Sequence, residues 1–268
     1  MPIPRHRVFA IRYGRHERTA KENFISVVGD PNRPMPMDYF IWLIGCADGR
    51  SIVVDTGFDE AVAARRGRKV LRSPIVGLAA LGVDVSAVGD VLVTHLHYDH
   101  VGNTRAFPRA RFWVQEKELH FTTGRYMCHG FFRLAYEPTE VAAMIDRLFD
   151  GSVFPVDGDV EVVPGVSLHW VGGHTAGLQV VRVHTEAGWL VLASDLMHYY
   201  ENFQAPNLFP VVYRPEEVLD GFTRVRSLAS DPRLIVPGHD PEVMKRFAAE
   251  PADAEHTVRL WLPNQGSG

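Results

Sequence analysis

The chain has 268 residues, of which 46% are hydrophobic, and a formal net charge of −4. A chain of this length and composition can bury one large core, so we expect a single domain over residues 1–268. The slight acidity gives no electrostatic basis for binding nucleic acid or an anionic membrane, so we expect neither as a partner.

The cysteines and the N-terminal residues indicate the compartment. Cys46 and Cys128 lie far apart and in no CxxC spacing, which argues against a disulfide framework and against a thiolate metal cluster. The N-terminal residues include no uninterrupted apolar segment followed by a small-residue cleavage site. No stretch approaches the roughly 20 apolar residues that a membrane-spanning helix requires. We therefore expect a cytoplasmic protein.

Short apolar, β-branched segments bounded by Gly, Asp or Pro predict a first block of strands. These expected strands are residues 7–13, 39–45, 51–55, 90–94 and 111–114. Residues 58–81 are rich in Ala, Arg and Leu, which predicts one or two helices, with a boundary at Ser73-Pro74.

A second block of strands is expected after a mostly helical segment at about 116–150. The expected strands of this block are residues 160–163, 166–171, 179–184, 189–193 and 234–236. Two strand blocks with helices between and after them predict an α+β fold, in which two sheets pack face to face and helices cover them. Periodicity alone leaves other α+β arrangements open.

One segment concentrates three histidines and an aspartate directly after a predicted strand: His95, His97, Asp99 and His100. A cluster of this spacing would arise by chance in on the order of one chain in a thousand of this histidine content. The end of a strand lets such side chains turn toward one point, and His95 and His97 share a face by their period-two spacing. Neutral imidazoles are common Zn²⁺ ligands and a carboxylate adds neutralising charge, so the segment predicts a metal site.

Further ligands are expected elsewhere, because four side chains cannot fill the coordination spheres of two ions. His174, Asp195 and His239 each follow an apolar segment at a point where the chain turns. Any one of them alone is explained more simply as a capping or core residue, but three at equivalent positions favour a shared site. Two divalent ions ~3.5–4 Å apart are an established catalytic arrangement.

These residues and their order resemble the metallo-β-lactamase superfamily, and among its branches the spacing is most like that of the N-acyl homoserine lactonases. The similarity runs from about Asp38 to His239. It includes Val53-Val54-Asp55-Thr56-Gly57, the motif from His95 to His100, Gly173-His174-Thr175, Ser194-Asp195 and Gly238-His239-Asp240. The resemblance implies a four-layer αβ/βα sandwich with the site at one edge of the two sheets.

The resemblance also implies two divalent metal ions, with Zn²⁺ favoured over Fe²⁺ and Mn²⁺. The implied ligands are His95, His97 and His174 for one ion, Asp99, His100 and His239 for the other, and Asp195 for both. Asp55 would orient a ligand histidine by a hydrogen bond.

The implied reaction is the opening of a small-molecule lactone, an N-acyl homoserine lactone or a related one, by attack of a metal-bridging hydroxide. Asp99 is the expected proton relay to the leaving alkoxide. In the lactonases a tyrosine three residues after the bridging aspartate helps to polarise the substrate carbonyl, whereas this sequence has His198 there. We expect His198 or the adjacent Tyr199 to take that role.

Alternatives remain at this point. Another ester, amide or phosphodiester hydrolase of the same superfamily is one, because such a site fixes metal-assisted hydrolysis more firmly than the bond that is cleaved. Asp195 stands where many dizinc β-lactamases carry a cysteine, which argues against that activity. A non-catalytic binding protein on this fold is a minority alternative, since all seven ligand positions are present. A homodimer is left open.

Substrate specificity is expected in the helical segment at about 116–150, which is rich in large apolar side chains. Ligand pockets are usually lined by such residues, although packing of the same side chains in the core is equally compatible with the sequence. The expected pocket residues are Met35, Met37, Met127, Phe131, Phe132 and Tyr136.

Overall fold

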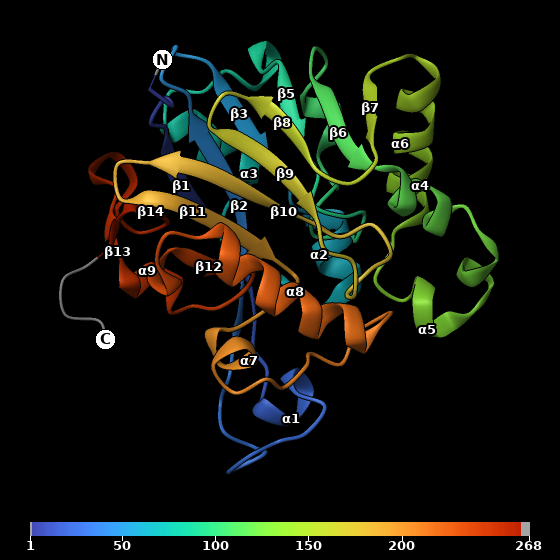
Figure 1. The fold of residues 1–268 in the computed structure, drawn as a ribbon. Helices are drawn as coiled ribbons and strands as arrows, with labels where there is room; N and C mark the ends of the chain where they lie inside the picture. The colour runs from blue at the N-terminus through green and yellow to red at the C-terminus, as the bar shows by residue number, and fades with distance from the viewer. Residues whose placement is uncertain (1, 264–268) are drawn as a thin grey trace.

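The computed structural model describes residues 2–263. Two sheets pack face to face in the middle of the molecule, and helices cover the outer face of each (Figure 1). The predicted α+β sandwich of four layers is confirmed. None of the helices within residues 2–263 has the length and apolar character needed to cross a membrane.

The larger sheet has nine strands within the described residues, in the order β13-β14-β1-β2-β3-β5-β6-β7, with β4 paired to β1. Strands β3, β5, β6 and β7 are parallel, so their carboxyl ends meet at one edge. The bounds are β1 (Arg7–His16), β2 (Met37–Gly45), β3 (Ser51–Val54), β4 (Lys69–Val70), β5 (Asp90–Leu92), β6 (Arg111–Gln115), β7 (Val153–Val156), β13 (Phe247–Ala249) and β14 (Thr257–Pro263).

The smaller sheet has the order β12-β11-β10-β9-β8 within the same residues. Its strands β8 to β11 form antiparallel pairs, whereas β11 and β12 are parallel and end together. The bounds are β8 (Val160–Val163), β9 (Val166–Trp170), β10 (Gln179–Thr185), β11 (Gly188–Ser194) and β12 (Ile235–Pro237).

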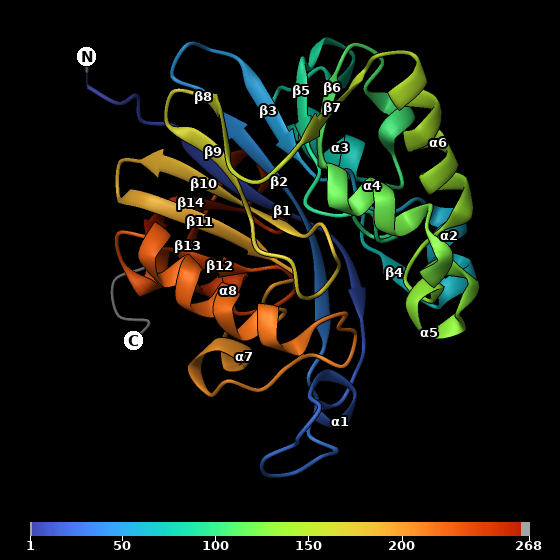
Figure 2. The ribbon, with the colours of Figure 1, turned by 45° about the vertical axis from the view of Figure 1, so that its right-hand side comes forward.

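Helices form the outer layers: α2, α3, α4 and α6 lie against the larger sheet and α8 lies against the smaller one (Figure 2). The predicted boundary at Ser73-Pro74 is confirmed, because the Ser73 hydroxyl accepts from the N–H of Ile75 and Pro74 begins α3. The α-helices are α1 (Ala20–Asn23), α2 (Glu60–Arg66), α3 (Pro74–Ala80), α4 (Glu116–Thr122), α5 (Gly130–Arg133), α6 (Pro138–Phe149), α7 (Tyr200–Gln204), α8 (Pro215–Leu228) and α9 (Val243–Arg246). The 3-10 helices are Val85–Ala87, Thr104–Ala106, Arg125–Cys128, Pro232–Leu234 and Pro251–Asp253.

Successive side chains of the central strands alternate between two cores, which explains why layers cover both faces of the larger sheet. In β2, Trp42 belongs to the core between the sheets, whereas its neighbours Ile41 and Leu43 belong to the core beneath the helices. Successive side chains of a strand point to opposite faces, so a strand that is apolar throughout must be covered on both. Every residue of β2 from Met37 to Ile44 is buried, as a central strand between two layers requires.

Candidate metal centre

Seven His and Asp side chains meet at the edge of the sandwich where strands of both sheets end. His95, His97, Asp99 and His100 lie on the loop after β5, and His174 lies between β9 and β10. Asp195 directly follows β11 and His239 follows β12. The larger sheet therefore supplies four of these residues and the smaller sheet three, all of them buried.

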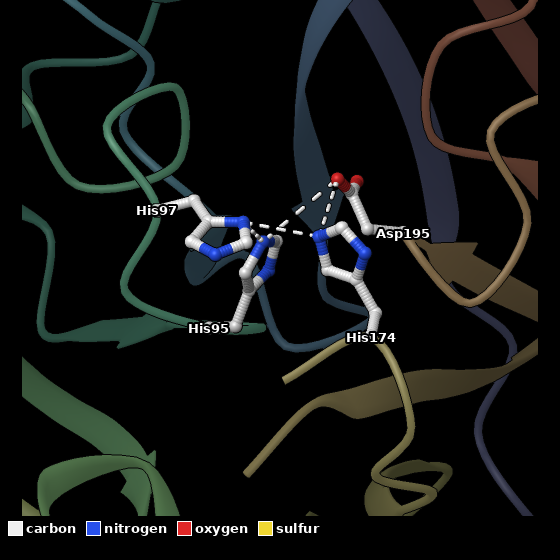
Figure 3. Close-up of side chains that lie close together, drawn as sticks. All are labelled: His95, His97, His174 and Asp195. Atoms are coloured by element: carbon white, nitrogen blue, oxygen red, sulfur yellow. Dashed lines mark hydrogen bonds and ion pairs between the residues drawn. The ribbon is translucent and has the colours of Figure 1, made fainter. Parts of the chain in front are cut away.

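The first group consists of His95, His97, His174 and Asp195, whose side chains point toward one another (Figure 3). The His97 Nδ1 atom lies 2.9 Å from His95 Nε2 and 3.0 Å from His174 Nε2. The distance from His174 Nε2 to Asp195 Oδ2 is 3.2 Å. Three ring nitrogens and a carboxylate oxygen thus surround one point.

The second group consists of Asp99, His100 and His239, and it meets the other oxygen of Asp195. Asp195 Oδ1 lies 3.0 Å from His239 Nε2 and 3.3 Å from His100 Nε2. Asp99 Oδ2 lies 3.7 Å from each of the same two nitrogens. Asp195 therefore stands between both groups, one oxygen toward each.

Hydrogen bonds at the far side of two rings show that these groups suit cations. His174 Nδ1 donates to the carbonyl of Val211 at 2.7 Å, and His239 Nδ1 donates to the carbonyl of Asp38 at 2.9 Å. A carbonyl only accepts, so in each neutral ring the proton is on Nδ1 and Nε2 carries a lone pair. Those lone pairs face the Asp195 oxygens, an arrangement that a divalent cation between them would stabilise.

The electrostatics favour the ligand forms at His95, His97 and Asp195, whereas nearby carboxylates raise the pKa of His100 and His239. Burial, together with neighbouring His100, lowers the pKa of His95 well below its ordinary value, so its ring is neutral. Burial alone would raise the pKa of Asp195, but His239, His198 and His100 offset it and hold that pKa well below the ordinary range. Metal ions bind neutral imidazoles and carboxylates, so the residues present fit two divalent cations.

Asp55 lies behind the second group and contacts one of its histidines. Its carboxylate accepts from the N–H and the hydroxyl of Thr94, both at 2.8 Å, and from His100 Nδ1 at 2.7 Å. The three bonds orient the His100 ring and leave its Nε2 facing Asp195. Asp55 also has φ of 59°, a left-handed conformation that Asp tolerates better than most residues.

Glu118 was not predicted from the sequence, yet it fastens two of the ligand segments together. Its buried carboxylate accepts from the N–H of Leu96 at 3.1 Å and the N–H of Gly177 at 2.9 Å, and Tyr136 donates its hydroxyl at 3.1 Å. Leu96 lies between His95 and His97, and Gly177 ends the turn that begins at His174. A single glutamate in a helix carries no motif, so nothing in the spacing could have found it.

Comparison with known proteins decides the family. The model of the metallo-beta-lactamase superfamily matches residues 36–239, more than half of the chain and the whole span of the seven residues. The chain belongs to the metallo-β-lactamase superfamily. Members of the superfamily that are similar in sequence include an N-acyl homoserine lactonase of Bacillus thuringiensis, 25% identical over 237 residues, which cover 80% of this chain and 86% of the relative. A second lactonase, from Agrobacterium fabrum, is 27% identical over 227 residues, which cover 75% and 80%.

Solved structures of lactonases agree with the fold. A quorum-quenching N-acyl homoserine lactone lactonase has a TM-score of 0.73 at 24% identity, with 90% of this chain and 94% of that chain covered. A dizinc quorum-quenching lactonase has a TM-score of 0.68 at 16% identity, with 100% and 97% covered. At these identities the structures support the fold alone.

A cavity of about 210 Å³ opens onto the two groups. Of the six expected pocket residues only Met37 lines it. Tyr136 packs edge-on against His97 with ring centroids 4.5 Å apart. Met35 is buried in the core beneath the helices, and Phe131 is exposed. The remaining two, Met127 and Phe132, pack at the edge of that same core.

His198 lines the cavity, whereas Tyr199 does not. The Tyr199 hydroxyl donates to the carbonyl of Pro36 at 3.4 Å, away from the two groups. His198 Nε2 lies 3.1 Å from Asp195 Oδ2, and its ring stacks on Phe209 with centroids 3.6 Å apart. Burial lowers the pKa of His198 to about 3, so the neutral ring has a single N–H, and Asp195 is its nearest acceptor.

Proposed function

We propose that the protein is a hydrolase that holds two Zn²⁺ ions and opens a lactone ring, an N-acyl homoserine lactone or a related lactone, with residues 1–268 acting as one domain. The proposal rests chiefly on one observation: seven His and Asp side chains from four loops converge in two groups that share Asp195. The curated relatives named N-acyl homoserine lactonases support the choice of bond.

Two divalent cations bound to these groups would supply Lewis acidity and would make a water molecule acidic enough to act as a nucleophile near neutral pH. Asp195 and the five histidines hold this chemistry at the inner end of the cavity. Asp99 lines the cavity, so its carboxylate can accept the proton of the attacking water and return it to the departing ring oxygen. Tyr39 and Phe209 bound the same cavity and limit the access of bulk water.

His198 can serve in either of two ways. Its N–H can donate to the substrate carbonyl as the ester oxygen gains charge, or it can keep its bond to Asp195 and orient that carboxylate. The variant His198→Ala separates these roles. A lower kcat with two metal equivalents retained supports contact with the carbonyl, and loss of metal together with activity supports the orienting role.

The function is tested with a pH-drop assay on γ- and δ-lactones, including N-acyl homoserine lactones of different acyl lengths, beside bis-p-nitrophenyl phosphate. We expect turnover of the lactones, and loss of both turnover and metal in Asp195→Ala. Turnover of the phosphodiester alone would replace the proposed bond with a phosphate ester. A wild-type protein with less than one metal equivalent per chain would favour a binding protein without catalysis.

A further inference from the structure

Three arginines line the cavity that opens onto the metal centre: Arg18, Arg66 and Arg68. Among the described residues that line it, the acidic ones are Asp99 and Asp195, and both face the metal centre. The outer part of the cavity therefore carries cationic side chains with no carboxylate beside them in its wall. Such an imbalance in a half-enclosed space attracts anions.

Arg66 is neutralised within the protein and does not contribute to this imbalance. Its Nε donates to Glu137 Oε1 at 2.7 Å, and its two terminal nitrogens donate to the carbonyls of Leu134 and Tyr136. Each of its three guanidinium nitrogens thus donates a hydrogen bond within the protein. Arg66 closes one wall of the cavity as a structural residue.

Arg68 has no carboxylate within ion-pair distance anywhere in residues 2–263. It is held by neutral partners: its Nε donates to the Tyr98 hydroxyl at 3.0 Å, and its Nη1 donates to the carbonyl of Arg66 at 2.6 Å. Tyr98 in turn shares a 3.0 Å hydrogen bond with Tyr39. The guanidinium is therefore fixed in position by neutral partners, and Asp99 acts on its charge only from beyond ion-pair distance.

Arg18, in the segment before α1, also lines the cavity without a paired carboxylate. Its Nη2 donates to the carbonyl of Glu22, and no carboxylate in the described chain lies within ion-pair distance of it. Its Nε is buried without a hydrogen-bond partner. The guanidinium lies 5.3 Å from the centre of the Phe209 ring, which stacks on His198. Two stacked rings, Phe209 and His198, thus lie between Arg18 and Asp195 of the metal centre.

His16 contacts Arg68 and is influenced electrostatically by both cations. Its Nε2 lies 3.2 Å from Arg68 Nη1, and its pKa falls to about 4 because of burial, Arg68 and Arg18, in that order. The neutral His16 ring therefore leaves the charge of the two guanidiniums uncompensated. Other arginines near this edge are paired differently, since Arg15 reaches Asp38 at 3.1 Å and Arg33 reaches Glu201 at 2.6 Å. Arg18 and Arg68 differ from these arginines because both line the cavity and neither has a carboxylate within ion-pair distance.

We propose that Arg18 and Arg68 form a binding site for a carboxylate on the substrate, so that the preferred substrate is an anionic lactone with its carboxylate outside the ring. This inference rests on the proposed function and names its substrate class. Guanidinium–carboxylate hydrogen bonds are charge-assisted and roughly twice as strong as neutral ones. A substrate with a neutral tail would leave both cations without that bond.

The test compares two lactones that differ only in distal charge, N-succinyl homoserine lactone and its terminal carboxamide, N-succinamoyl homoserine lactone. The scissile ring is the same in both. We expect kcat/KM for the carboxylate to exceed that for the carboxamide by about tenfold or more at low salt. The ratio should fall as KCl is raised, because salt screens charges that are partly exposed.

Variants assign the preference to the two arginines. In Arg18→Gln and in Arg68→Gln the ratio of the two kcat/KM values should fall severalfold, and in the double variant it should approach one. Arg68→Lys, which keeps a positive charge, should retain part of the preference. The matched control is Arg65→Gln, because Arg65 lies on α2 one residue before Arg66 but pairs with Glu137 outside the cavity. Its ratio should equal that of the wild type.

Calorimetric binding of the two ring-opened products separates this inference from the proposed function. If both lactones turn over with equal kcat/KM, the anion site is refuted while the lactonase proposal stands. If neither lactone turns over but the succinyl product binds more tightly than the succinamoyl product in wild type and not in the double variant, the anion site stands and the lactonase proposal fails. Equal binding of both products would refute the anion site in that case too.

Discussion

Glu118 gives the sharpest structural prediction, because one buried carboxylate ties the loop of His95 and His97 to the loop of His174. The substitution Glu118→Gln keeps the size of the side chain but replaces one acceptor oxygen with an NH₂ group. One of the two backbone N–H groups that now donate to it, from Leu96 and Gly177, would then face a donor.

The expected size of the effect follows from these bonds. A buried N–H left without an acceptor costs ~1–3 kcal/mol, and the lost bond releases one of the two ligand loops. Loss of a hydrogen bond that orients metal ligands typically lowers metal affinity by about 10–100-fold. We therefore expect Glu118→Gln to lose roughly 1–3 kcal/mol of unfolding free energy and one to two orders of magnitude in metal affinity.

The assay is a competition titration against a chelator of known zinc affinity, with thermal unfolding of the same samples. Glu116→Gln is the matched control, because Glu116 is an exposed residue in the first turn of the same helix α4. It should bind metal as the wild type does. A Glu118→Gln protein that keeps wild-type metal affinity would refute the idea that this carboxylate holds the two ligand loops.

Three further predictions concern neighbouring residues. Asp55→Asn can keep the left-handed backbone but gives the His100 Nδ1–H a weaker acceptor. Metal affinity should therefore fall by about 10–100-fold in the same titration. Unchanged affinity would show that Asp55 does not orient the His100 ring. Gly173→Ala would strain a residue with φ of 84° and bring a Cβ within 2.6 Å of a backbone nitrogen of α8, so the melting temperature of this variant should fall. A Cβ at Gly130 would lie in open space, so Gly130→Ala should leave the melting temperature unchanged. His16 takes up its proton near pH 6.5 when unfolded and near 4 when folded, so its contribution to stability is present above pH 6.5 and is lost as the pH falls toward 4. His16→Asn should therefore lose less unfolding free energy than the wild type between pH 7 and 5 in urea titrations, and equal losses would exclude this role.

The strands and the metal-facing residues could be predicted because they leave local signals. The apolar segments correspond to β1 to β3, β5, β6 and β8 to β12, with ends that differ by at most three residues. The expected strand end at Thr94 is shorter because β5 stops at Leu92, where the chain turns so that the hydroxyl of Thr94 can reach Asp55. Side chains that follow strand ends converge wherever the strands are neighbours, and this is why the spacing could predict the seven residues.

Other parts of the fold could not be predicted. The strand β7 contains Pro155, a residue that disfavours strands, and the sequence of β14 has no alternation that distinguishes it from a loop. Both are strands because a sheet edge is available to pair with them, through β6 and β1 respectively. The substrate-pocket residues stay a prediction, because large apolar side chains indicate burial but not the surface they cover. The cavity beside the two groups is lined by Met37 from the expected set and by Leu134 and Ala135 from the expected segment. Arg18, Tyr39, Arg68 and Phe209 line it from elsewhere in the chain.

Anomalous X-ray scattering at the zinc edge, from crystals of the protein grown with zinc, tests the central claim most directly. We predict two peaks roughly 3.5–4 Å apart, one between His97 and His174, the other beside His239, with Asp195 between them. A single peak, or peaks away from these side chains, would contradict the assignment of a two-metal hydrolytic centre.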